Sequence, residues 1–267
     1  MIIQIYEIQT PVEAQTLIDL GVDHIGSVIV SEAEWKVPDI KDTLECVRSS
    51  SAKSSLIPLF NTPGSVFRIL EYYRPDIIHF CEALTNQPDV TTYCRRLIEL
   101  QREVKARFPD IRIMRSIPIA RSGEGNFSIP TLEIAGWFEP FSDLFLTDTM
   151  LNSQSGTGVE NQPVQGFVGL TGQTCNWDTA GRLAESSHIP VILAGGISPA
   201  NVSAGILRTR PAGVDSCTLT NARDENGRPI RFKKDPQKVK QLIEAVREAE
   251  IALVGTNNIE ERNLSAC

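Results

Sequence analysis

The 267-residue chain contains 41% hydrophobic and 22% charged residues, a balance typical of soluble globular proteins and compatible with one large α/β domain. Its formal net charge of -7 argues against a nucleic-acid partner, because such a partner requires a basic face. No apolar run is long enough to span a bilayer, and the first residues lack the charged and apolar regions of a signal peptide. We therefore expect a cytoplasmic protein without a membrane partner.

Cysteine and histidine usage predicts neither disulfides nor a metal site. The six cysteines are scattered and form no pair with zinc-like spacing. The three histidines share no spacing typical of metal ligands. We therefore expect reduced thiols, no bound metal and no cofactor.

A short β-branched run, a polar turn and an amphipathic stretch recur along the chain. The predicted strands are 2–8, 23–30, 55–60, 76–80, 111–117, 143–147, 190–194 and 213–219. The predicted helices are 12–20, 40–49, 66–73, 89–107, 131–137, 177–186, 199–208 and 236–249. Strands that alternate with helices form parallel βαβ units, which either close into a barrel or make a doubly wound sheet. The number of strands favours a single (β/α)8 TIM barrel over residues 1–250.

Two segments depart from the short connections of this repeat. Residues 149–175 form a long, polar, glycine-rich loop, which is typical of a lid, a binding loop or a disordered segment. Residues 251–267 begin with a brief apolar stretch and end in polar residues. We expect them to form a C-terminal appendage with a frayed end.

The predicted strand 190–194 leads into a turn that suits an anion. Gly195 and Gly196 remove side chains where the strand ends, and Ser198 followed by Pro199 supplies an N-cap and a first-turn proline. Backbone N–H groups at such a helix start attract phosphate, and glycines let it approach closely. The alternative is a tight turn without a ligand. In a barrel, phosphate commonly sits after strands 7 and 8, which favours the anion site.

Two further features lie near predicted strand ends. Asp148 follows the sixth strand, where partial burial can raise the pKa of a carboxyl and let it transfer protons. The alternative is an aspartate that caps the following loop. Gly169 and Gly172 make the next segment flexible, and Trp177 offers an apolar surface. The alternative there is a helix-entry turn with a buried tryptophan.

These segments, in this order, resemble the phosphoribosylanthranilate isomerase family. Asp148 is followed by GLTGQTCNWD at 169–178, LAGGISPANV at 193–202 and GVDS at 213–216. They are similar to the family's GGTGxTFDW, LAGGLxPxNV and GVDVSSGVE. The N-terminal part is more weakly similar but in register, with DHIG at 23–26 resembling GADxIGFVF.

The resemblance implies an Amadori rearrangement of a phosphorylated ribosylamine, which is a step of tryptophan biosynthesis. Such chemistry needs a general acid to open the sugar ring and a general base to remove the C2 proton. Asp148 matches the family's acid. Arg115 matches a family lysine and would keep a substrate-binding cation on the strand-5 wall, with a surface or interface ion pair as the alternative. The resemblance implies phosphate binding at Gly172, Gly195, Gly196, Ser198 and Thr218.

Strand 1 departs from the family's pattern KICG, in which the cysteine is the base. Tyr6 occupies the position of that cysteine, and an unperturbed phenol with a pKa of about 10 is a poor base at neutral pH. Cys81 and Cys217 lie near strand ends and offer a thiol, although packing in the barrel is the preferred interpretation. Leu219 stands where close backbone approach is usual in the second phosphate wall.

Two functions are compatible with these residues. The first is an isomerase like those of the family, in which Asp148 and Tyr6 are catalytic. The second is a paralogue that binds or transforms a different phosphorylated small molecule and has lost isomerase activity. A partner-binding barrel without catalysis is a third class. We expect a phosphorylated small molecule as the ligand, and a monomer or homodimer as the assembly.

Overall fold

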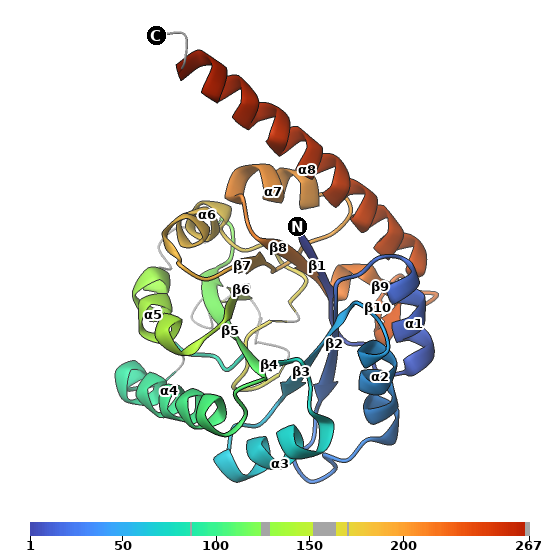
Figure 1. Ribbon diagram of the computed structural model, residues 1–267, viewed down its shortest axis with the longest axis vertical. Coiled ribbons are helices and arrows are strands. Elements are labelled where there is room, and N and C mark those ends of the chain that lie inside the picture. Colours follow the sequence, from blue (N-terminus) through green and yellow to red (C-terminus); the bar gives the residue numbers. More distant parts are fainter. Residues whose placement is uncertain (86, 124–128, 152–163, 170, 265–267) are drawn as a thin grey trace.

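Eight parallel strands close into a barrel in the order β1 to β8, with helices around the outside (Figure 1). The computed structural model describes residues 1–85, 87–123, 129–151, 164–169 and 171–264, and their side chains up to Val254. The strands are β1 (Ile2–Ile5), β2 (His24–Ile29), β3 (Lys53–Pro58), β4 (Ile77–Phe80), β5 (Arg112–Ala120), β6 (Leu144–Met150), β7 (Val191–Leu193) and β8 (Gly213–Ser216). The helices are α1 (Pro11–Asp19), α2 (Pro38–Arg48), α3 (Pro63–Tyr73), α4 (Val90–Arg107), α5 (Thr131–Phe138), α6 (Trp177–Ser186), α7 (Val202–Thr209) and α8 (Pro236–Leu264). The predicted (β/α)8 TIM barrel is confirmed, and each barrel strand overlaps a predicted one.

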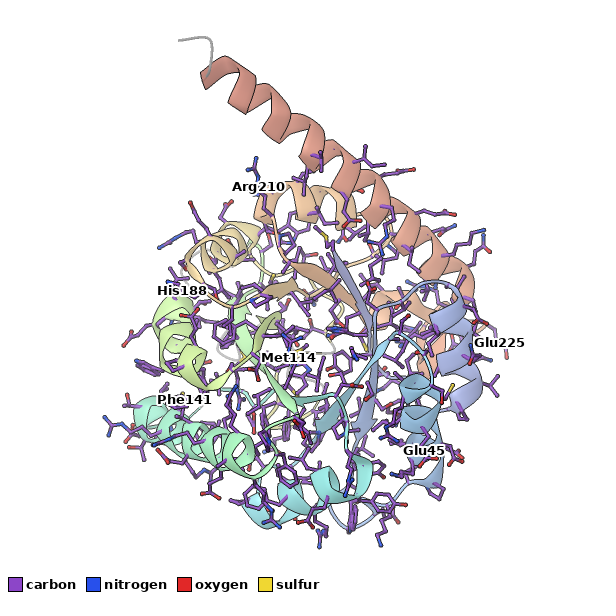
Figure 2. All side chains as sticks on the ribbon, in the orientation of Figure 1. Glu45, Met114, Phe141, His188, Arg210 and Glu225 are labelled. Carbon is purple, nitrogen blue, oxygen red and sulfur yellow. The ribbon has the colours of Figure 1, made fainter. Side chains whose placement is uncertain are left out.

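The barrel strands are buried on both faces because side chains fill the interior and helices cover the outside. All six residues of β2 are buried, for example. Successive side chains of a strand point in opposite directions. Met114 therefore lies inside the barrel (Figure 2), whereas its neighbour Arg115 points outward and donates to the Gln101 side chain on α4.

Most helices begin where the sequence supplies a proline or a capping side chain. Pro11, Pro38 and Pro63 stand in the first turns of α1, α2 and α3. The side chains of Asp89 and Asn176 cap α4 and α6 by accepting backbone N–H groups. These signals explain why the helix starts could be predicted to within a few residues.

The helix after the paired glycines starts later than predicted. α7 begins at Val202 with Asn201 as its N-cap residue, so Ser198 and Pro199 do not start it. The Asn201 side chain explains the delay, because its Oδ1 accepts from Ser198 N at 2.8 Å and its Nδ2 donates to Gly196 O at 2.8 Å. These bonds hold the segment before α7 as a turn.

A two-stranded hairpin that the sequence did not predict follows β8. Its antiparallel strands are β9 (Asn221–Arg223) and β10 (Pro229–Lys234). Arg231 on β10 donates through Nε and Nη2 to Oε1 of Glu7, at 2.8 and 2.6 Å. The hairpin therefore lies on the barrel rim beside the end of β1.

The C-terminal helix α8 packs against the barrel with its first part and then projects away from it (Figure 1). The helix continues without a break past residue 250, and Ile251 is 75% exposed. Within the described part of the chain, no helix combines the length and apolar character needed to cross a membrane.

Candidate active site

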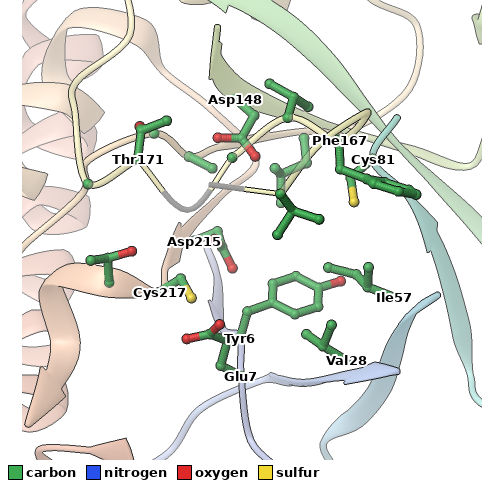
Figure 3. A pocket seen from close by; sticks show the side chains of 18 of the residues that line it. Tyr6, Glu7, Val28, Ile57, Cys81, Asp148, Phe167, Thr171, Asp215 and Cys217 are labelled. Atoms are coloured by element: carbon green, nitrogen blue, oxygen red, sulfur yellow. The ribbon is translucent and has the colours of Figure 1, made fainter. Parts of the chain in front are cut away.

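A cavity opens at the carboxyl ends of the strands, where the active sites of (β/α)8 barrels lie (Figure 3). Residues at the ends of β1 to β4 and β6 to β8 line it. Asp148 and Asp215 bring carboxyl groups into this space, and Tyr6 extends its ring below them (Figure 3).

Asp148, on β6, lies in the cavity as predicted. Its Oδ1 accepts a hydrogen bond from Thr149 N at 2.9 Å. The loop backbone at Gly169 lies so close that a Cβ there would sit 2.3 Å from Oδ2 of Asp148. Gly169 also has a φ of 106°, which glycine adopts without strain. Burial under this loop raises the pKa of Asp148 to about 7.

Asp215, on β8, is the second carboxyl of the cavity. It is 7% exposed, and its Oδ1 accepts a hydrogen bond from Nε2 of Gln4 at 3.1 Å. Burial raises the pKa of Asp215 to about 7, and the negative charge of Asp148 adds to the increase. The sequence placed Asp215 inside the motif GVDS without assigning it a role. Strand alternation could have identified Asp215 as a residue of the barrel interior, because it turns Asp215 and Gly213 to the same inner face.

The two carboxyls together hold a mixture of charged and neutral forms at neutral pH. Each pKa lies near 7, and the charge on Asp148 disfavours ionisation of Asp215. Such a pair titrates in two steps that belong to both groups, and the form with one proton is populated between them. One member can then donate a proton while the other accepts one.

Tyr6 belongs to a buried hydrogen-bond network at the bottom of the cavity. Its hydroxyl bonds to Oγ of Ser55 and lies 2.7 Å from Nδ1 of His79, whose Nε2 lies 2.9 Å from Oγ of Ser116. Burial raises the pKa of Tyr6 well above its ordinary value and lowers the pKa of His79 to about 3. The ring covers Gly26, where a Cβ would sit 2.2 Å from it. At neutral pH, Tyr6 is therefore a neutral phenol packed into the barrel.

We expect the substitution Tyr6→Phe to destabilise the fold by about 1 to 3 kcal/mol, because Ser55 and His79 each lose a buried hydrogen-bond partner. The ring still covers Gly26, so we expect kcat to stay within about threefold of wild type. Urea unfolding and initial rates measure the two effects. A folded variant that loses activity by orders of magnitude would instead give the phenol a part in proton transfer.

Cys81 and Cys217 line the cavity as protonated thiols. Burial raises the pKa of both groups far above the ordinary value of 9.0. Among the described residues, no group of three or more His, Cys, Asp and Glu side chains is arranged to hold a metal ion.

Four of the residues predicted to bind phosphate line one side of the cavity, namely Gly172, Gly195, Gly196 and Thr218. The three glycines have φ values of 64°, 86° and 63°. A Cβ on Gly196 would sit 2.6 Å from Thr174 N, so the loops after β6 and β7 are in backbone contact there. Only glycine allows this approach at that φ. This side of the cavity, the glycine wall, is formed by Gly172, Gly195, Gly196 and Thr218. It therefore consists mainly of peptide groups rather than side chains.

Two other predicted ligand residues face elsewhere. Ser198 gives its backbone N–H to Asn201, as described above, and it does not line the cavity. Arg115 is fully buried between the barrel strands and the surrounding helices. There it pairs with Glu82 and lies over the rings of Phe80 and Phe138. The prediction that Arg115 faces the substrate is wrong, because alternation along β5 turns it away from the interior.

Glu7 adds a third acidic side chain to the cavity wall. It has a φ of 66°, a left-handed conformation that is strained for a residue with a Cβ. The family's KICG pattern has glycine at this position, and glycine adopts this conformation freely. Its carboxylate pairs with Arg231 of the hairpin. The sequence missed this contact because the two residues are separated by nearly the whole chain.

The described part of the long predicted loop lies across the end of the barrel. Val168 N donates to Cys81 O at 2.8 Å, and Asn176 N donates to Ala120 O at 2.9 Å, so the loop is attached to the ends of β4 and β5. Residues 152–163 and 170 of the predicted loop lie outside the described residues. The attached segment covers Asp148 and supplies Gly172 to the glycine wall.

Comparison with known proteins agrees with the motifs. No protein-family model matches the sequence. The chain is 26% identical over 249 residues to N-(5'-phosphoribosyl)anthranilate isomerase of Methanocella arvoryzae, covering 89% of this chain and 94% of that protein. It is 29% identical over 242 residues to the protein of the same name from Moorella thermoacetica, covering 89% and 86%.

Solved structures agree with the fold. Phosphoribosyl anthranilate isomerase from Thermotoga maritima aligns with a TM-score of 0.64 at 18% identity, covering 93% of this chain and 100% of that chain. Monomers made from the dimeric form of that protein align with a TM-score of 0.63 at 18% identity over the same shares. The solved structures show likeness of fold alone. The sequence matches to proteins of the same name extend over most of the chain. The chain is therefore similar to the phosphoribosylanthranilate isomerases in sequence over most of its length and in fold, as its motifs predicted.

Proposed function

We propose that this protein catalyses the Amadori-type isomerisation of a phosphorylated ribosylamine, with N-(5'-phosphoribosyl)anthranilate as the substrate. The observation that carries the proposal is the placement of two carboxyls in one cavity, half-buried Asp148 and buried Asp215, where burial raises the pKa of each to about 7. This arrangement supplies an acid and a base at the same pH.

The glycine wall would hold the phosphate of the substrate. Gly172, Gly195 and Gly196 line the cavity with peptide groups that can attract an anion, and Thr218 adds a hydroxyl. Backbone donors suit an acidic protein, since they attract phosphate without basic side chains. All of these residues come from one chain, so the proposal holds for a monomer or a homodimer.

The reaction divides between the two carboxyls. Protonated Asp148 gives its proton to the ring oxygen, the bond from C1 to that oxygen breaks, and the nitrogen lone pair forms a C1=N iminium. Ionised Asp215 then removes the proton from C2, the electrons of that C–H bond form the C1=C2 bond of an enaminol, and the C1=N electron pair returns to the nitrogen. Protonation at C1 and loss of the O2 proton give the aminoketose. Ring opening leaves both carboxyls ionised, and removal of the C2 proton leaves one proton on Asp215. One transfer from Asp215 to Asp148, directly or through water, then restores the starting form.

Asp215 takes the role of base in this proposal instead of Tyr6. The raised pKa of Tyr6 keeps the phenol neutral, and the raised pKa values of Cys81 and Cys217 do the same for both thiols. Tyr6 contributes packing against Gly26 and a polar floor beneath the substrate.

The test is turnover of N-(5'-phosphoribosyl)anthranilate by the purified protein, followed as loss of the substrate's fluorescence. We expect conversion by the wild type and a large loss in Asp148→Asn and Asp215→Asn. The matched control is Asp178→Asn, an exposed aspartate on α6 paired with Arg208, which we expect to retain wild-type turnover.

The outcomes separate the competing functions. Absence of turnover in the wild type refutes isomerisation of this substrate. If such a protein still binds inorganic phosphate, the paralogue that acts on another phosphorylated molecule replaces the present proposal.

A further inference from the structure

A chain of buried polar side chains crosses the barrel interior next to Asp215. The strand register aligns Gln4 on β1 with Asp215 on β8 and, on the other side, with His24 on β2. Gln4 is fully buried and His24 is 5% exposed. Polar groups in a barrel interior lose their hydration on folding, so each needs a hydrogen-bond partner.

The hydrogen bonds fix the direction of the Gln4 amide. Its Nε2 donates to Oδ1 of Asp215 at 3.1 Å and contacts Sδ of Met114 at 3.8 Å. Its Oε1 lies 3.0 Å from Nδ1 of His24. A carboxylate and a thioether only accept hydrogen bonds, so the amide presents its NH2 group to both. Because the amide oxygen also only accepts, the ring of His24 carries its hydrogen on Nδ1.

The imidazole keeps this role across the range in which the carboxyl titrates. Burial lowers the pKa of His24 to about 4, so the ring is neutral where Asp215, with a pKa of about 7, changes its charge. The charged groups that act on the ring are Asp23, Arg112, Asp76 and Lys53.

We propose that Gln4 and His24 are positioning residues for Asp215: His24 orients the Gln4 amide, and the amide N–H holds the Asp215 carboxylate in place in its ionised form. The inference rests on the proposed function, in which Asp215 is the base. A hydrogen bond donated to a carboxylate favours its charged form. Without that bond, more of the protein carries a protonated Asp215 at neutral pH and has no base available.

The conservative and disruptive substitutions of His24 give the sharpest test. In His24→Asn, the amide nitrogen can replace Nδ1 as donor to Gln4, whereas His24→Leu leaves no donor. Gln4→Met removes the donor to Asp215 while keeping a side chain of similar length. Met114→Leu is the control, because it removes only the sulfur contact of the same amide.

The readout is the pKa of Asp215 itself, followed by NMR of the carboxyl carbon in protein labelled at aspartate Cγ and assigned with Asp215→Asn. We expect Gln4→Met and His24→Leu to raise this pKa by about one unit or more, and His24→Asn and Met114→Leu to leave it within about 0.3 unit of wild type. The low-pH limb of kcat/KM should move in the same direction in Gln4→Met and His24→Leu and stay in place in His24→Asn and Met114→Leu.

This design separates the inference from the proposed function. A pKa of Asp215 that is the same in His24→Leu, His24→Asn and wild type overturns the positioning role, whatever the turnover. A pKa that moves as expected in a protein whose Asp215→Asn variant is fully active supports the positioning contact and refutes Asp215 as the base. If Gln4→Met does not fold, the two His24 variants still decide the question.

Discussion

The substitution Asp148→Asn is expected to lower kcat by about 10²- to 10⁴-fold, which is the usual contribution of a general acid. The asparagine amide fills the same space beneath Gly169 but does not give up a proton to the ring oxygen. Single-turnover rates with N-(5'-phosphoribosyl)anthranilate measure the effect on chemistry, and substrate binding should change little. A variant that keeps more than about a tenth of the wild-type rate would remove Asp148 from the mechanism.

The same variant should be more stable than wild type at high pH. The pKa of Asp148 rises from its ordinary value of 3.8 to about 7 on folding, so the neutral carboxyl favours the folded state. That stabilisation is fully present below pH 3.8 and is lost as pH rises through about 7. We expect the free energy of unfolding of Asp148→Asn to exceed that of wild type at pH 8 by up to about 4 kcal/mol, and the difference to shrink towards pH 4. Unfolding by urea at both pH values checks it, and a constant difference would contradict the raised pKa.

The substitution Arg115→Ala is expected to destabilise the fold by about 3 to 5 kcal/mol, because it leaves the buried Glu82 carboxylate without its partner. The guanidinium also donates to Oε1 of Gln101 at 2.8 Å and stacks within 4.7 Å of the centre of the Phe138 ring. These contacts join β5 to α4 and α5, at a distance from the glycine wall.

Equilibrium unfolding of Arg115→Ala and of the double variant Arg115→Met with Glu82→Gln tests this role. We expect the double variant to recover much of the lost stability, since no charge then stays buried and unpaired. KM in the folded fraction should match that of wild type. A stable Arg115→Ala protein with a greatly raised KM would restore Arg115 as a substrate contact.

The fold was predictable because its signals are local. The apolar runs of the barrel strands and the prolines at the starts of α1 to α3 lie in short windows of sequence. The start of α7 was misplaced because the side chain of Asn201 bonds to Ser198 N and Gly196 O and holds the preceding residues as a turn. The hairpin after β8 escaped prediction because its residues are mostly polar and charged, and Arg231 finds its partner only in the folded barrel.

A site residue was predictable where its own type and position indicate its role. It was less predictable where contacts with distant residues determine that role. Asp148 stood out as a carboxylate at a strand end. Asp215 needed the structure, because its role depends on burial and on Gln4 from the first strand. Arg115 could have been assigned correctly by counting alternation from Met114, which faces the interior. The conformation of Glu7 has no signal in its own sequence, since a positive φ at a non-glycine residue reflects its surroundings.

The most direct measurement of the proposed chemistry is the pH dependence of kcat/KM for N-(5'-phosphoribosyl)anthranilate. Below the titration of both carboxyls there is no base, and above it there is no acid, so turnover requires the form of the pair that holds one proton. With the pKa values of Asp148 and Asp215 at about 7, we expect a bell-shaped profile with its maximum near neutral pH. A rate that continues to rise through pH 9 would point to a phenolate or thiolate base and contradict the carboxyl pair.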